Sequence, residues 1–344
     1  MMSEFTASCF PLWDEWFPEE PIGQGSAGTV SRIRRSTPEG VEYAALKQIT
    51  ISADTGNFRY ARAQGMDAGC IRYFFRAVLD ETMQEIDMMK QLSGCSNIVH
   101  LEDSLIREIS GQGRDTASDS VSGWMIFIRM ELLTPFIDRM AEDLFSPAEI
   151  CRVGMDLCSA LDACRQARIV HRDVKPENIF WQKETGAFKL GDFGFAHYME
   201  RPTEEKGRAG TLTHMSPEIY AGSSADYAGD LYALGIILYR LLNDNRIPFL
   251  PQYPGLFTPQ DRNLALLRRL RGENPPLPAA AVYAADLSCA ATGLGMSFSD
   301  RQRPAVAELA QIARKAVLAD PAARFRSAKE MRAALKAVAE SHLL

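Results

Sequence analysis

Hydrophobic and polar positions alternate through residues 20–50, and glycines interrupt the alternation. A period of two is typical of strands, so this stretch predicts twisted strands joined by tight turns. A helical spacing of apolar residues follows at Phe75, Val78, Leu79, Met83, Ile86 and Met89. Residues 98–105 and 124–133 are strand-like again. The front of the chain is therefore expected to form a sheet with one main helix.

After Pro135 the pattern becomes helical, and long helices are predicted over residues 156–167, 227–242, 305–318 and 327–340. We expect an α+β fold with two lobes after an N-terminal extension over 1–19. The small β-rich N-lobe is predicted at about 20–132 and a larger α-helical C-lobe at about 133–344. Two polar or glycine-punctuated segments, Ala53–Gly69 and Ser110–Gly123, predict loops.

Composition narrows the class of protein. The 344 residues are 46% hydrophobic and carry a net charge of −6, so there is no global basic field and we expect no nucleic-acid partner. Seven cysteines without a CxxC pair suggest neither a zinc site nor a disulfide framework, and Cys151 and Cys158 are expected as buried apolar residues. No signal peptide is seen, and the apolar run 233–239 is too short to span a bilayer. We expect a soluble, cytoplasmic protein without a membrane span in this chain.

The first chemical motif is a glycine-rich stretch, residues 23–30, which reads Gly-Gln-Gly-Ser-Ala-Gly-Thr-Val. Glycines let a backbone turn approach phosphates closely and offer N–H groups to them. No βαβ unit follows, so a dinucleotide-binding interpretation lacks its structural context. The next strand-like run ends at Lys47, which could hold phosphates beneath a glycine flap, although a single lysine is usually a surface charge.

The most specific motif is His-Arg-Asp-Val-Lys-Pro-Glu-Asn at residues 171–178, followed by Asp-Phe-Gly at 192–194. With the glycine loop and Lys47, this ordered set resembles the eukaryotic-type (Hanks-type) Ser/Thr protein kinase family over residues 16–335. The runs 230–242 and 320–331 are most similar to bacterial members. The resemblance implies a two-lobed protein kinase fold and ATP-dependent phosphoryl transfer to protein Ser/Thr hydroxyls, with autophosphorylation.

The resemblance assigns catalytic roles to four positions. Asp173 is expected as the base that orients the acceptor hydroxyl, and Lys175 as the residue that neutralises the γ-phosphate. Lys47 is expected to pair with the phosphates of ATP and with a glutamate, either Glu85 or, as the alternative, Glu81.

The resemblance also implies cofactor ligands. Asn178 and Asp192 are expected to bind Mg²⁺, with Mn²⁺ as an alternative ion. Met130 is expected as gatekeeper, with backbone groups of Glu131 and Leu133 for adenine. The full nucleotide site is expected to comprise Ile22, Gly23, Gly25, Gly28, Val30, Ala45, Lys47, Met130, Glu131, Leu133 and Phe180. The apolar members could equally serve as core packing.

The segment after the Asp-Phe-Gly motif resembles a peptide-binding segment that ends in Ser216-Pro217-Glu218. Glu218 is expected to pair with Arg324, and the run that starts at Asp230 to anchor the catalytic loop. Lys175 and Thr211 favour Ser/Thr over Tyr transfer.

Three features depart from the family pattern. Ala27 stands where an aromatic residue usually caps the glycine loop, Gly94-Cys95-Ser96 replaces the usual His-Pro, and the interval from Lys47 to Glu85 is long.

Two other functions compete with a protein kinase. A pseudokinase usually lacks one of three charged residues that this chain keeps: Lys47, Asp173 and Asp192. A small-molecule phosphotransferase lacks the peptide-binding segment.

Regulation is predicted at two places. Thr203 is a candidate activating phosphosite read by Arg172, although Glu200, Glu204 and Glu205 could occupy the same pocket and make the enzyme constitutively active. The polar loop 110–123 is expected to be dispensable for catalysis, and it contains the candidate autophosphorylation sites Thr116, Ser118 and Ser120.

Overall fold

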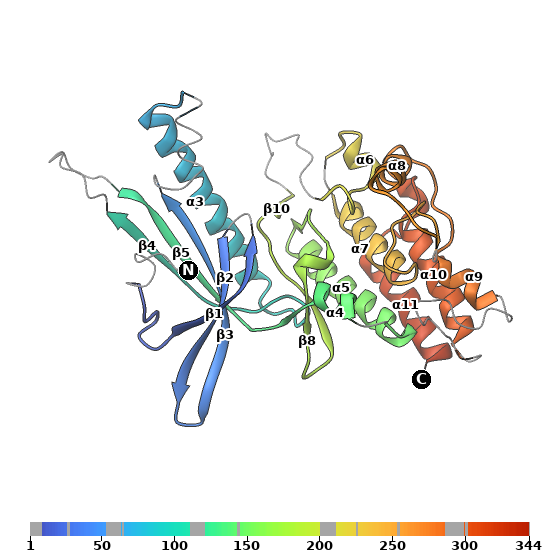
Figure 1. Cartoon of the computed structure of the whole chain (residues 1–344), viewed down its shortest axis with the longest axis horizontal. Coiled ribbons are helices and arrows are strands. Elements are labelled where there is room, and N and C mark those ends of the chain that lie inside the picture. Colours follow the sequence, from blue (N-terminus) through green and yellow to red (C-terminus); the bar gives the residue numbers. More distant parts are fainter. Residues whose placement is uncertain are drawn as a thin grey trace. The chain divides into compact units, whose positions relative to one another are not determined.

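The computed structural model describes residues 9–25, 28–52, 63, 65–110, 121–142, 145–199, 211–224, 226–252, 255–285, 299 and 302–343. The chain divides into two compact units, Met1–Ser93 with Val99–Leu133, and Gly94–Ile98 with Thr134–Leu344. The first unit contains the five-stranded sheet, and the second contains most of the helices (Figure 1). The expected two-lobed α+β class is confirmed.

The first unit is built on one antiparallel sheet with strand order β1-β2-β3-β5-β4. The strands are β1 (Phe17–Gly25), β2 (Gly28–Thr37), β3 (Gly40–Ser52), β4 (Leu101–Ser110) and β5 (Val121–Met130). The helix α3 (Ala68–Gln91) lies alongside the sheet (Figure 1). Its N-terminus is capped by Asp67, whose carboxylate accepts from the amides of Gly69 and Cys70.

The central strands β3 and β5 are apolar on both faces. Side chains alternate across a strand, so Ala44 and Leu46 point to one face of β3, and Ala45, Lys47 and Ile49 to the other. Both sets are buried apart from Lys47, which is partly buried. The sheet therefore needs a cover on each side, and α3 can cover only one of them.

The second cover comes from the chain before β1. Leu12 and Trp16 are buried in one cluster with Ile33, Ala44, Leu46, Met125 and Phe127, and Cys9, Phe10 and Trp13 pack against it. Arg107 donates to the carbonyl of Cys9 at 2.9 Å. The guanidinium of Arg129 lies over the rings of both Trp13 and Trp16. The described part of the expected extension 1–19 thus contributes Leu12 and Trp16 to the core of the first unit. The domain boundary placed there remains a prediction.

The second unit is mainly helical. Its helices are α4 (Phe136–Glu142), α5 (Pro147–Gln166), α6 (Pro217–Tyr220), α7 (Tyr227–Leu241), α8 (Pro259–Leu270), α9 (Ala279–Ala285), α10 (Arg303–Ala316) and α11 (Ala328–His342). The four predicted helices are all present. Helix α5 begins well before residue 156, at a capping box formed by Ser146 and Glu149.

Short strands support the loops of the second unit. The strands β6 (Thr134–Pro135), β8 (Ile179–Gln182) and β9 (Ala187–Leu190) form one sheet, and β7 (Ile169–Val170) pairs with β10 (His197–Tyr198). Two 3₁₀ turns, η1 (Pro176–Asn178) and η2 (Pro321–Ala323), complete the described part of the unit. The catalytic-loop motif lies between β7 and β8, and the Asp-Phe-Gly motif between β9 and β10.

Close helix packing depends on two glycines. A Cβ on Gly154 in α5 would lie 2.5 Å from Leu335 Cδ1 in α11, and a Cβ on Gly235 in α7 would lie 2.6 Å from Ala316 Cβ in α10. Helices α5 and α11 are accordingly side by side (Figure 1). The apolar run in α7 is buried as expected, and across the described ranges no helix combines the length and apolarity that a bilayer crossing requires.

The structure refines one expectation and confirms another. The loop expected over 110–123 is shorter, because β4 continues to Ser110 and β5 begins at Val121. Cys151 and Cys158 are buried thiols, and burial raises their pKa values to about 11 and about 12. Both are therefore protonated and unreactive at neutral pH, as expected for packing residues.

Candidate active site

The candidate site residues fall in both units. In the first unit, β3 and α3 bring Lys47 and Glu85 together, with Nζ 2.6 Å from Oε1. The Glu85 side chain is 6% exposed and that of Lys47 12%, so the pair is largely removed from water. Glu81 lies on the exposed side of α3. The structure therefore pairs Lys47 with the first-choice glutamate.

The glycine-rich stretch forms the end of the β1–β2 hairpin. Gly23 pairs with Val30 and Gly25 with Gly28. Gly28 has φ 155°, and a Cβ there would lie 2.1 Å from the carbonyl oxygen of Gln48 in β3. Only glycine fits this position, so the hairpin can lie against β3. Ala27 lies outside the described residues, and Ile22 is exposed.

The expected adenine-contacting positions cluster at the end of β5. Met130 pairs with Ala45 on β3, and Ala45 is buried. The amide of Glu131 donates to the carbonyl of His100, and the carboxylate of Glu131 accepts from the amide of His100 at 2.6 Å. The Glu131 amide is therefore already used, and it is not available to donate to a base. Leu133 is partly buried.

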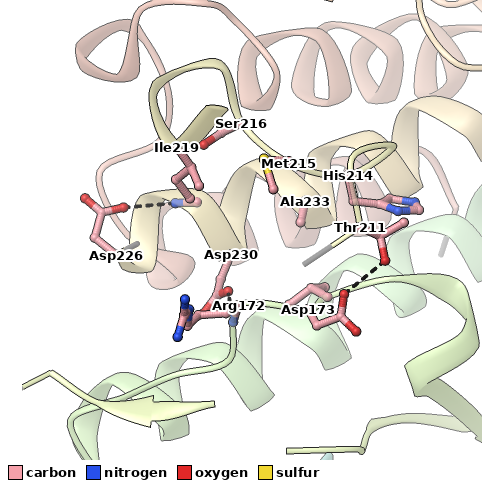
Figure 2. A pocket seen from close by; sticks show the side chains of 12 residues that line it. Arg172, Asp173, Thr211, His214, Met215, Ser216, Ile219, Asp226, Asp230 and Ala233 are labelled. Carbon is pink, nitrogen blue, oxygen red and sulfur yellow. Dashed lines mark hydrogen bonds between the residues drawn. The ribbon is translucent and has the colours of Figure 1, made fainter. Parts of the chain in front are cut away.

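In the second unit, Asp173 is the centre of a small hydrogen-bond network. Lys175 Nζ lies 2.6 Å from Oδ2, and Asn178 Nδ2 donates to Oδ2 at 3.1 Å and to the Asp173 carbonyl at 2.9 Å. Thr211 Oγ1 donates to the other oxygen, Oδ1, at 3.1 Å (Figure 2). Asp173 is 3% exposed. Its carboxylate therefore has a fixed orientation, with a different set of donors on each oxygen.

The loop that carries Asp173 is fastened to helix α7. Asp230 is buried and accepts from the amides of His171 and Arg172, both at 2.8 Å. Burial raises the pKa of Asp230, which the two amide donors oppose. Arg172 has φ 68°, an uncommon conformation that these bonds hold in place. The predicted anchoring of the catalytic loop by the Asp230 run is confirmed.

The Asp-Phe-Gly motif is tied to the same loop. The amide of Gly191 donates to the carbonyl of Asn178 at 2.9 Å, and Phe193 is buried with its ring 4.8 Å from that of His171. Asp192 follows with φ 57°, a conformation that needs local support in a residue other than glycine. The residues on both sides of Asp192 are thus held against the loop that carries Asn178.

These two residues fit a hard cation. The side-chain nitrogen of Asn178, Nδ2, donates to Asp173, so the side-chain oxygen Oδ1 is the atom left to bind a cation. Asp192 adds a carboxylate. Mg²⁺ prefers one or two such oxygens together with phosphate and water. Among the described residues, no group of three or more His, Cys, Asp or Glu side chains could hold a metal on its own. A pair of protein ligands is what a magnesium–nucleotide complex requires, rather than a dedicated metal cage.

The peptide-binding segment expected from the sequence ends at a partly buried ion pair. Arg324 donates from both terminal nitrogens to the two oxygens of Glu218, at 2.7 and 2.8 Å. Burial alone would raise the pKa of Glu218, but the bonds from Arg324 bring it below its usual value. The predicted Glu218–Arg324 pair is confirmed.

A small cavity separates this segment from the catalytic loop. Thr211, His214, Met215 and Ser216 line one side, and Arg172, Asp173 and Asp230 the other (Figure 2). It encloses about 20 Å³, which is room for one water molecule. It is far too small for a nucleotide, so it is a packing gap beneath the candidate site.

Several predicted positions are not described. Thr203 and its neighbouring glutamates, and Thr116, Ser118 and Ser120, lie outside the described residues, as does most of the loop Ala53–Gly69. Phe180 lies on β8, paired with Pro135, and is partly buried. Sequence reasoning missed Arg269, which contacts the expected peptide-binding segment, and His214, which lies within that segment. No spacing signal distinguishes Arg269 from the adjacent Arg268.

The fold and the arrangement around Asp173 are those of the protein kinase class. Residues 17–253 match the protein kinase domain family, which is most of the chain. The chain therefore belongs to the protein kinase family.

Bacterial Ser/Thr kinases are among its relatives. Serine/threonine-protein kinase PkaA of Streptomyces coelicolor is 27% identical over 247 residues, 70% of this chain and 40% of that protein. Serine/threonine-protein kinase PknB of Mycolicibacterium smegmatis is 30% identical over 199 residues, 57% of this chain and 27% of that protein. A probable serine/threonine-protein kinase PknB of Corynebacterium glutamicum is 36% identical over 117 residues, 33% of this chain and 18% of that protein. The matches thus span 18 to 40% of these relatives. The expected likeness to bacterial members is confirmed.

Proposed function

We propose that this chain is a Ser/Thr protein kinase, which transfers the γ-phosphoryl group of ATP to Ser and Thr hydroxyls of proteins, its own included. The observation that carries the proposal is the buried Asp173 carboxylate, which takes Lys175 and Asn178 on one oxygen and Thr211 on the other. A carboxylate fixed in this way can orient an acceptor hydroxyl and take its proton. Phosphoryl transfer needs this positioning more than it needs covalent chemistry.

The remaining groups supply charge. Lys47, oriented by Glu85, would hold the phosphates of ATP, and Lys175 would neutralise the γ-phosphoryl group as it moves. Asn178 and Asp192 would hold Mg²⁺ or Mn²⁺, and the bound ion would neutralise further charge on the phosphates. Met130, Glu131 and Leu133 would position adenine, with Ile22, Val30, Ala45 and Phe180 as apolar contacts.

The acceptor is proposed to be a protein. The support is the segment from Thr211 to Glu218, which contacts Asp173 at one end and is fixed by Arg324 at the other. A small-molecule phosphotransferase has no need of such a segment. We further propose a cytoplasmic location and no nucleic-acid acceptor, in keeping with the net charge of −6.

The test is a transfer assay with labelled ATP and magnesium, with and without a generic protein substrate. Wild-type protein should label the substrate on Ser and Thr, and Asp173→Asn should lower the rate by about 10²- to 10⁴-fold while ATP binding persists. Asp80→Asn, at an exposed ion pair on α3, is the matched control and should keep wild-type activity. ATP binding without any transfer would make the chain a pseudokinase. Labelling of small molecules but not of protein would make it a small-molecule phosphotransferase.

A further inference from the structure

Arg269 is a fully buried cation in the last turn of α8, with an exposed fraction of 1%. Removing a guanidinium from water costs several kcal/mol unless its hydrogens are well paired. The neighbouring Arg268 instead lies at the surface, where it pairs with Glu273. Arg268 already places a positive charge at the C-terminal end of this helix, so the burial of Arg269 requires a separate explanation.

The partners of Arg269 lie mainly in the peptide-binding segment. Nη1 donates to the carbonyl of Met215 at 2.5 Å, and Nη2 donates to the carbonyl of Leu212 at 2.6 Å. Nη1 also donates to the hydroxyl of Tyr232, at 3.0 Å. None of these three partners is a carboxylate. The guanidinium thus bridges two carbonyls three residues apart, which fixes the backbone shape of the segment between them.

That backbone shape controls Thr211. The amides of His214 and Met215 both donate to the carbonyl of Thr211, at 2.9 and 3.1 Å, and close a turn over 211–215. Thr211 in turn donates its hydroxyl to Asp173 (Figure 2). A continuous set of hydrogen bonds therefore runs from Arg269 through the turn to the proposed catalytic base. The side chain of Leu212 remains 48% exposed, so the backbone is fixed from the inside and the outer surface is left open.

We propose that Arg269 is a positioning residue for the protein acceptor: it fixes the turn 211–215 against Asp173, and transfer to protein depends on it more than ATP hydrolysis does. The inference rests on the proposed function, because it takes Asp173 as the base. Arg269 lies outside the recognised motifs and sets how a protein substrate meets that base.

A second consequence of the same geometry concerns His214. Its Nε2 lies 3.5 Å from Arg240 Nη1. Burial lowers its pKa to about 3, and the cations Arg240, Arg269, Lys175 and Arg262 add to this effect. Loss of the charge at Arg269 should therefore raise the pKa of His214. This pKa is a readout of Arg269 that does not depend on enzyme activity.

The test compares Arg269→Met with the matched surface variant Arg268→Met. Initial rates are measured for protein phosphorylation and for ATP hydrolysis without acceptor, together with the KM for ATP and for protein. For Arg269→Met, the ratio of protein transfer to ATP hydrolysis should fall by about 10- to 100-fold, mainly through the protein KM. Arg268→Met should keep the wild-type ratio, and Arg269→Lys should recover part of it. An NMR titration should show a raised pKa for His214 in Arg269→Met.

The outcomes separate the two proposals. Wild-type protein that labels no protein substrate overturns both. Active wild-type enzyme with an unchanged ratio in Arg269→Met overturns only the role of Arg269, as does a parallel loss of transfer and hydrolysis. If Arg269→Met does not fold, Arg269→Lys decides. An ammonium cannot bridge both carbonyls in the guanidinium's geometry, so a folded Arg269→Lys with the wild-type ratio overturns the inference, and a reduced ratio supports it.

Discussion

Asp192 combines a charge with a backbone conformation that few residues adopt. Its φ of 57° lies in the left-handed region, which asparagine tolerates better than alanine. Asp192→Asn therefore removes the proposed magnesium ligand's charge with little added strain. We expect it to lose most of the stabilisation by Mg-ATP that wild-type protein gains, which is about 2.7 kcal/mol at a ligand concentration of 100 Kd. Thermal melts with and without Mg-ATP measure this.

Asp80→Asn is again the control for this experiment, since it removes an exposed carboxylate of the other unit. Equal stabilisation of Asp192→Asn and wild-type protein by Mg-ATP would contradict the metal assignment. Stabilisation by ATP alone, without magnesium, should be similar in both proteins.

His214 predicts a pH dependence of stability. Burial and Arg240 lower its pKa to about 3 in the folded state, whereas an unfolded histidine titrates near 6.5. Below about pH 6.5 the unfolded chain binds a proton that the folded chain excludes. The free energy of unfolding should therefore fall on acidification from pH 6.5 toward pH 3, by up to about 1.4 kcal/mol per pH unit from this residue.

Urea denaturation at pH 7, 6 and 5 tests this prediction in wild-type protein and in His214→Asn. The variant lacks the titrating group, so its stability should decline less steeply over the range. Replacement of the exposed, non-titrating Val41 by alanine should leave the slope as in wild type. Identical slopes in wild-type protein and His214→Asn would rule out the buried neutral imidazole.

Single residues also show where sequence reasoning stops. The spacing of the motifs was sufficient to place Asp173, Lys175 and Asn178 on one loop. It left Glu81 and Glu85 as alternatives, because a choice between them depends on which face of α3 meets β3. Arg268 and Arg269 are adjacent and chemically identical, and only packing decides that one is in water and the other buried.

The segment before β1 should contribute strongly to stability. Leu12 is fully buried against the apolar face of β3 and β5. Leu12→Ala should lower the free energy of unfolding by about 2–5 kcal/mol, because it removes buried methyl groups and leaves a cavity. The control is Val41→Ala on β3, which is 47% exposed and should cost no more than about 0.5 kcal/mol. Urea denaturation compares the two, and equal effects would show that the segment is not packed.

Helix α7 should tolerate no side chain at Gly235. An added Cβ would lie 2.6 Å from Ala316 Cβ and 2.8 Å from Val317 Cγ1, closer than packed carbon atoms allow. Gly235→Ala should therefore destabilise by about 1–3 kcal/mol, although alanine favours helices. Gly94→Ala, where nothing lies within 4 Å, is the control. Stabilisation by Gly235→Ala would contradict the close approach of α7 and α10.

Helices and strands differ in how well the pattern predicted them. The apolar periodicity of α7, α10 and α11 fixed their existence and nearly their bounds. The first half of α5 and all of α8 were missed, although Ser146 and Thr258 begin capping boxes there. Residues 9–16 could not be recognised as core, because eight residues without a strand or helix period carry no pattern. Their burial depends on apolar residues far along the chain, on β2, β3 and β5.

Across the whole chain, the order of motifs predicted most of the fold and of the candidate site. Both units contain part of the expected site, and each part is ordered locally. Glu85 orders Lys47, Asn178 orders Asp173, and Asp230 holds the loop that carries Asp173. The sequence could not predict how the peptide-binding segment is fixed, because Arg269 comes from a helix that follows it by more than 40 residues. Contacts of this kind are set by tertiary structure alone.

The segment 9–16, which covers one face of the sheet, has a consequence for where the folded domain begins. The family match starts at Phe17, immediately after the last tryptophan of the cover. A fragment cut at that residue would keep every proposed catalytic group and yet leave Ile33, Leu46 and Phe127 in water. A large exposed apolar surface favours association with other apolar surfaces, so such a fragment should self-associate or bind chaperones. The stretch of sequence that matches the family is thus shorter than the stretch that covers the apolar face of this sheet.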